Sequence, residues 1–505
     1  MPVEHPSGRR FRLHSMTRRE FMVVAGAGTI WTAEQARATF PRSTDPSTQL
    51  TFMSATKLAQ MIREKKVSSV EVLRAHLAQI DRVNPKLNAV VQFCRERAMA
   101  EAQQADAMLA KGTVKGPLHG VPMTIKDSFD TAGVVSTGGT LGRKDFVPAA
   151  DATVVARLRA AGAILVGKTN TPEFTLSFKT SNLVYGASRN PYNTDYQTGG
   201  SSGGAAAIVA AGGSPFEIGS DFGGSIRFPA HCCGIAGIKP TTGRVPRTGH
   251  IIDYGGYYDW WQQVGPLARR VEDLVTILPI VAGPDYIDAA IVPMPLEDPA
   301  AVNLNGLRVA FYTDNGIAKC RADMQQTVKD CAGFLSEKGA RVSETPLPML
   351  KECFEVVSKL YGSDDFAWIK RLIRKDGTRQ TSPELGLTGK MLTAAEFTEA
   401  AEQCDSYRSA MLAFMETHDI ILCPAHSSAA SPINDPPPFD TYTVTYNHTG
   451  WPGAVVRAGT STEGLPLGIQ IVGRPWTEHV VLAVASFIES RTGGWQKPAI
   501  AEGRS

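Results

Sequence analysis

Three glycine-rich segments of this 505-residue chain carry amine or hydroxyl groups that could act on a carbonyl carbon. Residues 120–127 place Lys126 at the end of an apolar run. Residues 198–204 hold two adjacent serines among four glycines, and residues 220–230 contain Ser225 directly after two glycines. Partial desolvation lowers the pKa of such a lysine toward values that suit a base, and unobstructed glycine N–H groups can converge on an oxyanion. Together the three segments favour acyl transfer.

Each segment also has a simpler interpretation. Lys126 could be an ordinary strand-end lysine paired with Asp127, and residues 198–204 could be a flexible linker, although an alanine-rich helix is expected directly after them. Residues 162–169 match the phosphate-loop pattern G-x-x-x-x-G-K-[ST], but a helix precedes them and their four variable residues resemble a strand, so nucleotide binding is not expected. The chain has no H-E-x-x-H zinc motif, and its ten histidines are scattered without ligand spacing. We therefore expect no metal site and a base other than histidine.

The three segments resemble the amidase signature family, serine hydrolases of amides and related acyl compounds. The resemblance runs from about residue 55 to the C-terminus and includes the motifs GIKPT at 237–241, GPLAR at 265–269 and GLPLGIQIVGR at 464–474. It implies an α/β fold with a large mixed, mostly parallel twisted sheet flanked by helices on both faces. The expected organisation is an export signal at 1–38, a linker at 39–54 and a single amidase signature domain at 55–505.

The resemblance also assigns roles to individual residues. Ser225 corresponds to the nucleophile, Ser201 to a bridging serine held in a cis peptide, and Lys126 to the base. The family's oxyanion loop corresponds to the backbone N–H groups of Ser225 and of Phe222, Gly223 and Gly224. The family's supporting positions correspond to Ser202 and Asp221. The resemblance implies no metal, nucleotide or organic cofactor.

Several aromatic residues depart from the usual family pattern or lie in a loop between its motifs. Phe222 stands where smaller or β-branched residues are more usual, which predicts a narrower pocket. The aromatic candidates for an acyl or leaving-group pocket are Tyr254, Tyr257, Trp260, Trp261 and Trp451. Glycines mark 253–261 as a loop, which favours the pocket interpretation, although the same side chains could pack in the core. The aromatic residues predict an aryl or otherwise apolar substrate.

Short apolar runs that alternate with helical periodicity independently favour an α/β sheet over a helix bundle. The expected strands are residues 121–125, 163–166, 307–312 and 467–472. The expected helices include one that opens with a capping box at 68–71, and others at 94–109, 153–161, 324–338 and much of 356–418.

The slight positive charge of the chain comes from its N-terminus. The whole chain has 52 Lys+Arg and 49 Asp+Glu, a formal net charge of +3, and residues 1–38 hold six arginines and three glutamates. Removing them leaves a formal charge of zero, which argues against a polybasic nucleic-acid module. Residues 17–22 (TRREFM), a short apolar run at 23–31 and A-R-A at 36–38 predict a bacterial twin-arginine export signal. We expect a periplasmic or secreted enzyme, or a cytoplasmic one if the signal is not functional; Met16 is an alternative start to Met1.

The eight cysteines form no C-x-x-C pair and are too sparse for a disulfide scaffold, so most are expected to be small buried hydrophobes. The expected partner is a small amide substrate, with no nucleic acid and no stable membrane anchor in the mature form; a homodimer is left open. The alternatives to an amidase are a carbamate or ester hydrolase using the same site, an amidotransferase A-type subunit, and a catalytically idle binding protein on the same scaffold. Intact Lys126, Ser201 and Ser225 argue against the last of these.

Overall fold

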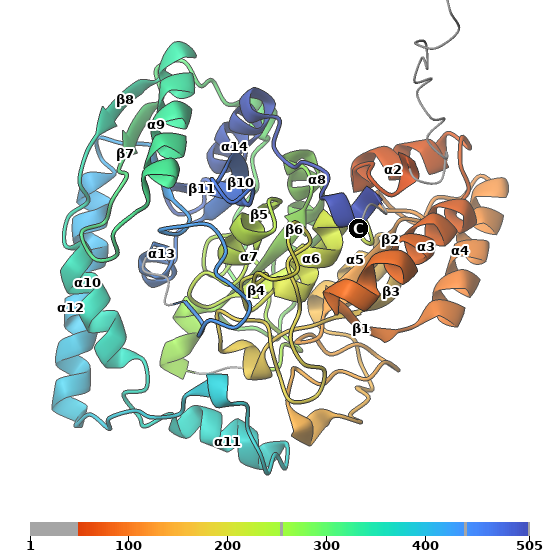
Figure 1. Ribbon diagram of the computed structural model, residues 1–505, viewed down its shortest axis with the longest axis horizontal. Coiled ribbons are helices and arrows are strands. Elements are labelled where there is room, and N and C mark those ends of the chain that lie inside the picture. Colours follow the sequence, from red (N-terminus) through yellow and green to blue (C-terminus); the bar gives the residue numbers. More distant parts are fainter. Residues whose placement is uncertain (1–48, 253–255, 439–441, 503–505) are drawn as a thin grey trace, which may run out of the picture. The chain divides into compact units, whose positions relative to one another are not determined.

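The computed structural model describes residues 49–252, 256–438 and 442–502, and these belong to one compact unit, 45–505. The predicted export signal lies outside the described residues. Eight strands form the larger sheet (Figure 1), in the order β4-β6-β5-β10-β11-β9-β7-β8. They are β4 (Phe216–Asp221), β5 (Ala236–Lys239), β6 (Gln263–Ala268), β7 (Arg308–Phe311), β8 (Arg341–Glu344), β9 (Ile420–Pro424), β10 (Gly453–Thr460) and β11 (Pro466–Gly473).

The strand directions correct one part of the expected fold. The sheet is large and mixed, as predicted, but only β9-β7 and β7-β8 are parallel neighbours. The other five neighbouring pairs, from β4-β6 to β11-β9, are antiparallel. The prediction of a mostly parallel sheet is therefore wrong, because strand partners far apart in the chain are chosen by tertiary packing rather than by the local alternation of strands and helices.

A second sheet of three strands carries the predicted base. Its order is β1 (Val90–Phe93), β3 (Ile164–Thr169) and β2 (Pro122–Lys126), and β2 runs parallel to β3. All six residues of β3 are buried. This strand is the segment that resembles a phosphate-binding loop, and its extended, paired backbone confirms that it is not one.

Thirteen named helices surround the two sheets in the described residues. They are α2 (Ala55–Arg63), α3 (Ser69–Leu87), α4 (Arg95–Ala110), α5 (Thr153–Ala160), α6 (Gly203–Ala210), α7 (Arg227–Cys232), α8 (Val271–Val281), α9 (Ala322–Glu337), α10 (Leu350–Leu360), α11 (Ala367–Lys375), α12 (Ala394–Phe414), α13 (Val444–Thr449) and α14 (Glu478–Thr492). The predicted capping box is present at the start of α3, where the Glu71 N–H donates to Ser68 Oγ over 3.1 Å and the Ser68 N–H donates to the Glu71 carboxylate over 2.8 Å. None of the helices described is long and apolar enough to cross a membrane.

Helices cover both faces of the larger sheet, as expected. On β11, a Cβ added at Gly468 would point at His231 of α7, whereas one added at Gly473 would point at Val481 of α14. Residues separated by an odd number of positions in a strand face opposite sides. Helices α7 and α14 therefore lie on opposite faces, and every residue of β11 is buried between them.

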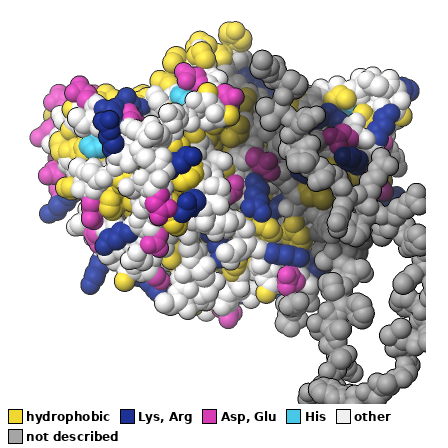
Figure 2. All heavy atoms as spheres, turned by 90° about the horizontal axis from the view of Figure 1, so that it is seen from above, with side chains coloured by type: hydrophobic (Ala, Val, Ile, Leu, Met, Phe, Trp, Pro, Cys, Tyr) yellow, Lys and Arg dark blue, Asp and Glu magenta, His cyan; other side chains and the backbone are white. Residues whose placement is uncertain are grey.

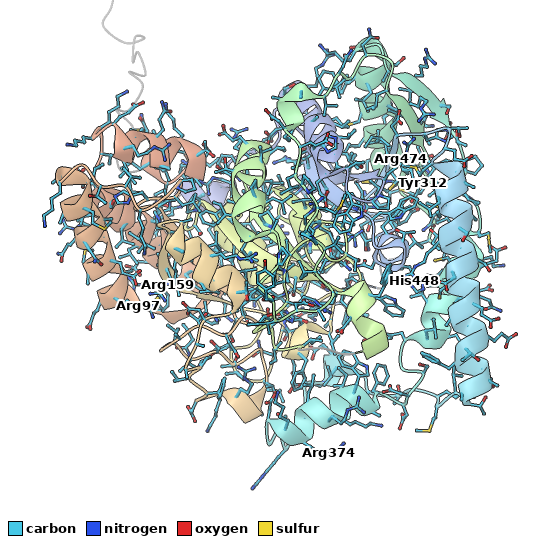
Figure 3. The ribbon with its side chains drawn as sticks, turned by 180° about the vertical axis from the view of Figure 1, so that it is seen from behind. Arg97, Arg159, Tyr312, Arg374, His448 and Arg474 are labelled. Carbon is cyan, nitrogen blue, oxygen red and sulfur yellow. The ribbon has the colours of Figure 1, made fainter. Side chains whose placement is uncertain are left out.

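Helices α4 and α5 are joined through one acidic side chain. Glu101 accepts from Arg97 Nε over 3.1 Å and from Arg159 Nη2 over 2.9 Å (Figure 3). Elsewhere on the surface, the face shown in Figure 2 carries Lys and Arg intermixed with Asp and Glu. Such a mixture fits the formal charge of zero calculated without residues 1–38.

The cysteines behave as small apolar side chains. All eight lie in the described residues, where none of them forms a disulfide, and all but Cys94 are buried. This burial confirms the expectation from the sequence.

Candidate active site

Lys126 ends β2 with its side chain fully buried among hydroxyl groups. Its Nζ lies 2.7 Å from Ser201 Oγ, 2.9 Å from Ser202 Oγ and 3.0 Å from Ser220 Oγ. Burial lowers the pKa of Lys126 well below its ordinary value, and the nearby carboxylates of Asp221 and Glu217 oppose the effect only in part. A buried amine with a lowered pKa is neutral often enough to accept a proton.

The alternative pairing of Lys126 with Asp127 is wrong. The Asp127 carboxylate instead accepts hydrogen bonds from the backbone N–H and the hydroxyl of Thr137. Burial raises the pKa of Asp127 to about 6. Lys126 is thus left to the three serines, which is the arrangement that acyl transfer needs.

The serine loop 198–204 is a fixed turn rather than a flexible linker. The Gly200–Ser201 peptide is cis, as the family resemblance implies. A Cβ on Gly200 would lie 2.6 Å from the backbone of Ser177 and Phe178, so only glycine allows this close approach. The Ser202 N–H donates to the Ser225 carbonyl over 3.2 Å, and α6 begins at the next residue. The loop is therefore bound directly to the loop of the predicted nucleophile.

Ser225 is 5% exposed and lines a cavity. Within the described residues its hydroxyl has no hydrogen-bond partner, so the oxygen is available to a substrate. Its loop is shaped by Asp221, whose carboxylate accepts from the N–H of Gly224 over 2.8 Å and of Ile226 over 3.1 Å. The Gly224 N–H is therefore committed to Asp221, which corrects its assignment as an oxyanion donor. The Gly223 N–H makes no such bond to this carboxylate.

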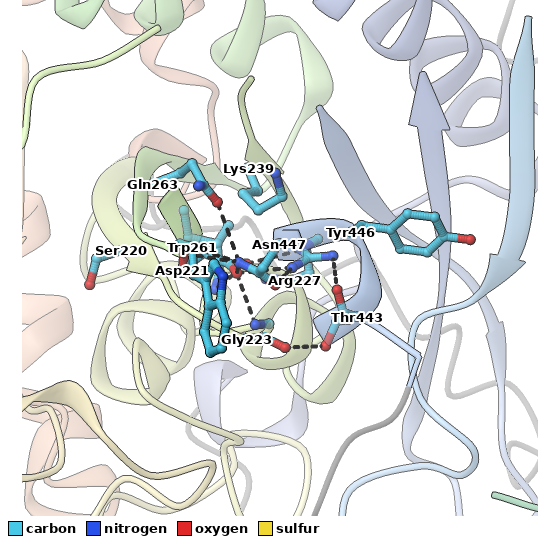
Figure 4. Close-up of polar contacts among 12 residues, drawn as sticks. Ser220, Asp221, Gly223, Arg227, Lys239, Trp261, Gln263, Thr443, Tyr446 and Asn447 are labelled. Carbon is cyan, nitrogen blue, oxygen red and sulfur yellow. Dashed lines mark hydrogen bonds and ion pairs between the residues drawn. The ribbon is translucent and has the colours of Figure 1, made fainter. Parts of the chain in front are cut away.

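A buried ion pair holds Asp221 in place (Figure 4). Arg227 donates from Nη2 and Nε to the two Asp221 oxygens over 2.9 and 3.0 Å, and Asn447 Nδ2 donates to Oδ1 over 2.8 Å. Arg227 also donates to the Thr443 carbonyl over 2.9 Å and to Gln470 Oε1 over 2.7 Å. Despite complete burial, these partners hold the pKa of Asp221 well below its usual range. Arg227 and Asn447 thereby connect α7 and α13 to the loop that precedes Ser225.

The cavity beside Ser225 has a volume of about 340 Å³ and a mainly apolar lining. Phe222 lines it, and the Phe222 ring packs 5.5 Å from Trp261, 6.2 Å from Tyr361 and 6.3 Å from Trp368. Glu384 supplies the one carboxylate of its lining, and this group has no hydrogen bond or ion pair within the described residues. Phe222 thus lies at the cavity wall, and the narrowing expected from its ring stays a prediction.

The structure separates the aromatic pocket candidates. Trp261 lines the cavity beside Ser225. Trp260 is 41% exposed and lines a neighbouring cavity of about 880 Å³, where its Nε1 donates to the His448 carbonyl over 3.0 Å. Trp451 is buried in the core and lines neither of these two cavities, which corrects its assignment to the pocket. Tyr254 and the Tyr257 side chain lie outside the described residues.

Sequence reasoning missed several residues of the site. Ser220 and His250 join the Lys126 cluster, with His250 Nε2 lying 3.0 Å from Ser220 Oγ. Tyr361, the residue after α10, and Phe178 line the cavity from distant parts of the chain. Only Ser220 and Arg227 carried a signal, because both lie inside the 220–230 motif. In the part of the chain that the structure describes, no three His, Cys, Asp or Glu side chains could hold a metal ion.

Comparison with known proteins decides the family. The amidase family profile matches residues 71–482. The chain belongs to the amidase signature family. This makes it an amidase-family hydrolase that acts on amides, with the fold of that family.

Individual relatives differ in what they act on. The chain is 35% identical to the A subunit of the glutamyl-tRNA(Gln) amidotransferase of Roseiflexus sp. (strain RS-1), over 86% of this chain and 95% of that protein. It is 33% identical to the fatty-acid amide hydrolase 2 of Homo sapiens, over 89% of this chain and 91% of that protein. A solved 6-aminohexanoate cyclic dimer hydrolase in complex with its substrate superposes with a TM-score of 0.80 at 27% identity, covering 90% of this chain and 99% of that one.

Proposed function

We propose that this protein hydrolyses the C–N bond of amides through an acyl-enzyme on Ser225. The observation that carries the proposal is the 2.7 Å contact between Lys126 Nζ and Ser201 Oγ, beside a cavity-lining Ser225 whose loop is bonded to the loop of Ser201. A serine hydroxyl is a poor nucleophile unless a base removes its proton during attack. Lys126, acting through Ser201, supplies that base.

The reaction then follows two steps in which the proton moves through the same groups. Ser225 Oγ attacks the carbonyl carbon while its proton passes to Ser201, and the Ser201 proton passes to Lys126. The C–N bond breaks as the lysine returns a proton through Ser201 to the leaving nitrogen, which departs as an amine or ammonia. Water next attacks the Ser225 ester by the same relay, and a carboxylic acid leaves. The N–H groups of Gly223 and Ser225 are the proposed donors to the oxyanion; Phe222 remains a further predicted donor.

The cavity lining supports an aryl or otherwise apolar substrate. Phe222 and Trp261 place aromatic surface beside Ser225, and Val357 of α10 and Tyr361, the residue after that helix, add to the wall. Apolar walls with few polar groups bind apolar ligands and leave orientation to those few groups. The fatty-acid amide hydrolase among the relatives fits this inference.

The alternative functions use the same site and differ in the substrate that is cleaved. A carbamate or an ester presents the same carbonyl carbon to Ser225, so bond preference must be measured. The amidotransferase A-type subunit is the second candidate function, favoured by the 35% identical relative. If this chain is such a subunit, supplying it should restore growth of a strain that lacks the subunit. If it is an exported amidase, growth should not be restored.

We also propose that residues 1–38 direct export by the twin-arginine route. The support is the sequence alone, namely the paired arginines, the apolar run and the A-R-A motif. Replacing Arg18 and Arg19 with lysine should retain the protein in the cytoplasmic fraction, and continued export of that variant would contradict the proposal.

Two assays test the proposed function. A fluorophosphonate should label the wild-type protein covalently, and Ser225→Ala should remove the label; label that persists would mean that another residue is the nucleophile. A hydrolysis panel of aryl anilides, aliphatic amides, carbamates, esters and peptide amides should show turnover of amides by the wild type and none by Ser225→Ala. The same panel measures bond preference.

A further inference from the structure

The three serine hydroxyls around Lys126 cannot all make the same kind of hydrogen bond to its amine. A neutral amine has two N–H donors and one lone pair, and three hydroxyls lie within 3.0 Å of Nζ. If Lys126 is to take the proton of Ser201, its lone pair must face Ser201, and the other two hydroxyls must act as acceptors. Which hydroxyl donates to the lysine depends on where each of the three sends its own proton.

Two of the three hydroxyls have a second hydrogen-bond partner. Ser202 Oγ donates to the Ser220 carbonyl over 3.4 Å. Ser220 Oγ lies 3.0 Å from His250 Nε2. Among the described residues, Ser201 Oγ has Lys126 Nζ as its hydrogen-bond partner and no other. Ser201 is therefore the hydroxyl that is left to donate to Lys126.

The tautomer of His250 decides the direction of the Ser220 bond. His250 Nδ1 lies 3.2 Å from both the carbonyl oxygen and the nitrogen of Ile252, so the backbone accommodates a proton on either ring nitrogen. With the proton on Nδ1, Nε2 accepts from Ser220. With the proton on Nε2, Ser220 would turn its own proton toward Lys126 and compete with Ser201. The first tautomer is the one that fits a base acting on Ser201, and we assign it on that ground.

The surroundings of His250 keep its ring neutral and fixed. The ring is 3% exposed and packs edge-on against Phe129, with centroids 5.0 Å apart. Burial lowers the pKa of His250 to about 3, and the positive charges of Arg247 and Arg143 act in the same direction, as does Lys126 when it is protonated. An imidazole that stays neutral keeps one nitrogen free to accept a hydrogen bond.

We propose that His250 is a positioning residue of this site: by accepting a hydrogen bond from the Ser220 hydroxyl, it keeps Ser220 from donating to Lys126 and leaves the lysine lone pair to Ser201. The proposal rests on the proposed amidase function. His250 touches neither Ser225 nor the cavity lining, so its effect is on the efficiency of the base and not on substrate binding.

A double-mutant cycle tests the proposal. His250→Phe keeps a ring against Phe129 but removes the acceptor, and should lower both kcat and the rate of fluorophosphonate labelling about 10- to 100-fold with KM unchanged. His250→Gln can place its side-chain oxygen near the former Nε2 and should recover most of that loss. In a Ser220→Ala background residue 220 has no hydroxyl that could donate to Lys126, so His250→Phe should change the labelling rate less than about twofold.

Several outcomes would overturn the proposal. A purely structural role predicts the same loss from His250→Phe with and without Ser220, or no recovery by His250→Gln. Thermal unfolding of each variant controls for folding, and His250→Leu replaces the Phe variant if that one is unstable. Labelling of wild-type Ser225 and its loss in Ser225→Ala are measured in parallel, so failure of the His250 proposal can be distinguished from failure of the proposed function.

Discussion

Replacing Asp221 with asparagine tests whether the nucleophile loop depends on a buried ion pair. Asp221 Oδ1 accepts from Gly224, Arg227 and Asn447, and Oδ2 accepts from Ile226 and again from Arg227. An asparagine turns one of these oxygens into a donor that faces other donors. It also leaves the Arg227 guanidinium, which is 0% exposed, without its counter-charge. Breaking one side of a buried pair costs about 3–5 kcal/mol.

A matched control separates charge from burial. Asp273 is also fully buried, and its carboxylate accepts from the N–H groups of Ala55 and Thr56 over 3.0 and 2.9 Å without an ion pair among the described residues. Asp273→Asn should therefore cost only about 1–3 kcal/mol, the penalty of a disturbed buried hydrogen bond. Urea unfolding, followed by tryptophan fluorescence, measures the free energy of unfolding of both variants. The two values can be compared when the denaturant slopes (m-values) are equal. Asp221→Asn should also abolish labelling of Ser225, whereas Asp273→Asn should retain it.

The pH dependence of the difference provides a second check. The native pKa of Asp221 lies below its unfolded value of about 3.9. Its stabilisation is therefore complete above the unfolded pKa and is lost as the pH falls through the native pKa. The deficit of Asp221→Asn should be constant from about pH 6 to 8 and should shrink below about pH 4. A loss for Asp221→Asn no greater than that for Asp273→Asn would refute this account.

Three further predictions concern the chemistry, the loop and the substrate. Lys126→Met should lower kcat about 10²- to 10⁴-fold, and an unchanged kcat in this variant would identify another base. In the wild type, kcat/KM should fall with decreasing pH as Lys126 becomes protonated, through a pKa below that of an ordinary lysine. Gly224→Ala should abolish fluorophosphonate labelling, because the φ of Gly224 is +142° and a Cβ there would lie 2.2 Å from Thr443 Oγ1. A Cβ on Gly223 would lie 3.3 Å from its nearest neighbour, so Gly223→Ala should fold normally, as a thermal melt would show. Glu384→Gln should raise kcat/KM for anionic anilides and lower it for cationic ones by several-fold, with neutral anilides as the control; equal changes for all three would contradict a charge effect.

The local motifs were sufficient to find the groups that we propose to react. Glycines around Ser201 and before Ser225, and an apolar strand before Lys126, are short-range patterns whose meaning depends on few neighbours. The structure brings Lys126 and Ser201 to 2.7 Å and binds the Ser202 amide to the Ser225 carbonyl. The capping box of α3 was also predictable, since its partners are three residues apart.

Residues whose role depends on a distant partner were not predictable in the same way. Trp451 and Trp261 are the same residue type and both are 2% exposed in the core, yet Trp261 lines the cavity beside Ser225 and Trp451 does not. Tyr361 reaches the cavity from the C-terminal end of α10, just beyond its last residue and more than one hundred residues after Ser225. An aromatic ring is equally suited to a core and to an apolar pocket, so only packing decides between them.

The sequence by itself determined the family, the residues proposed to react and the mixed α/β class, because glycine, serine and lysine at these positions act through local backbone geometry. Tertiary structure alone decided the strand directions, the commitment of the Gly224 amide to Asp221, and the link from His250 through Ser220 to Lys126. The physical reason is that hydrogen bonds and ion pairs in a buried site must be satisfied by whatever groups the fold brings within about 3 Å. Sequence separation carries no information about those partners.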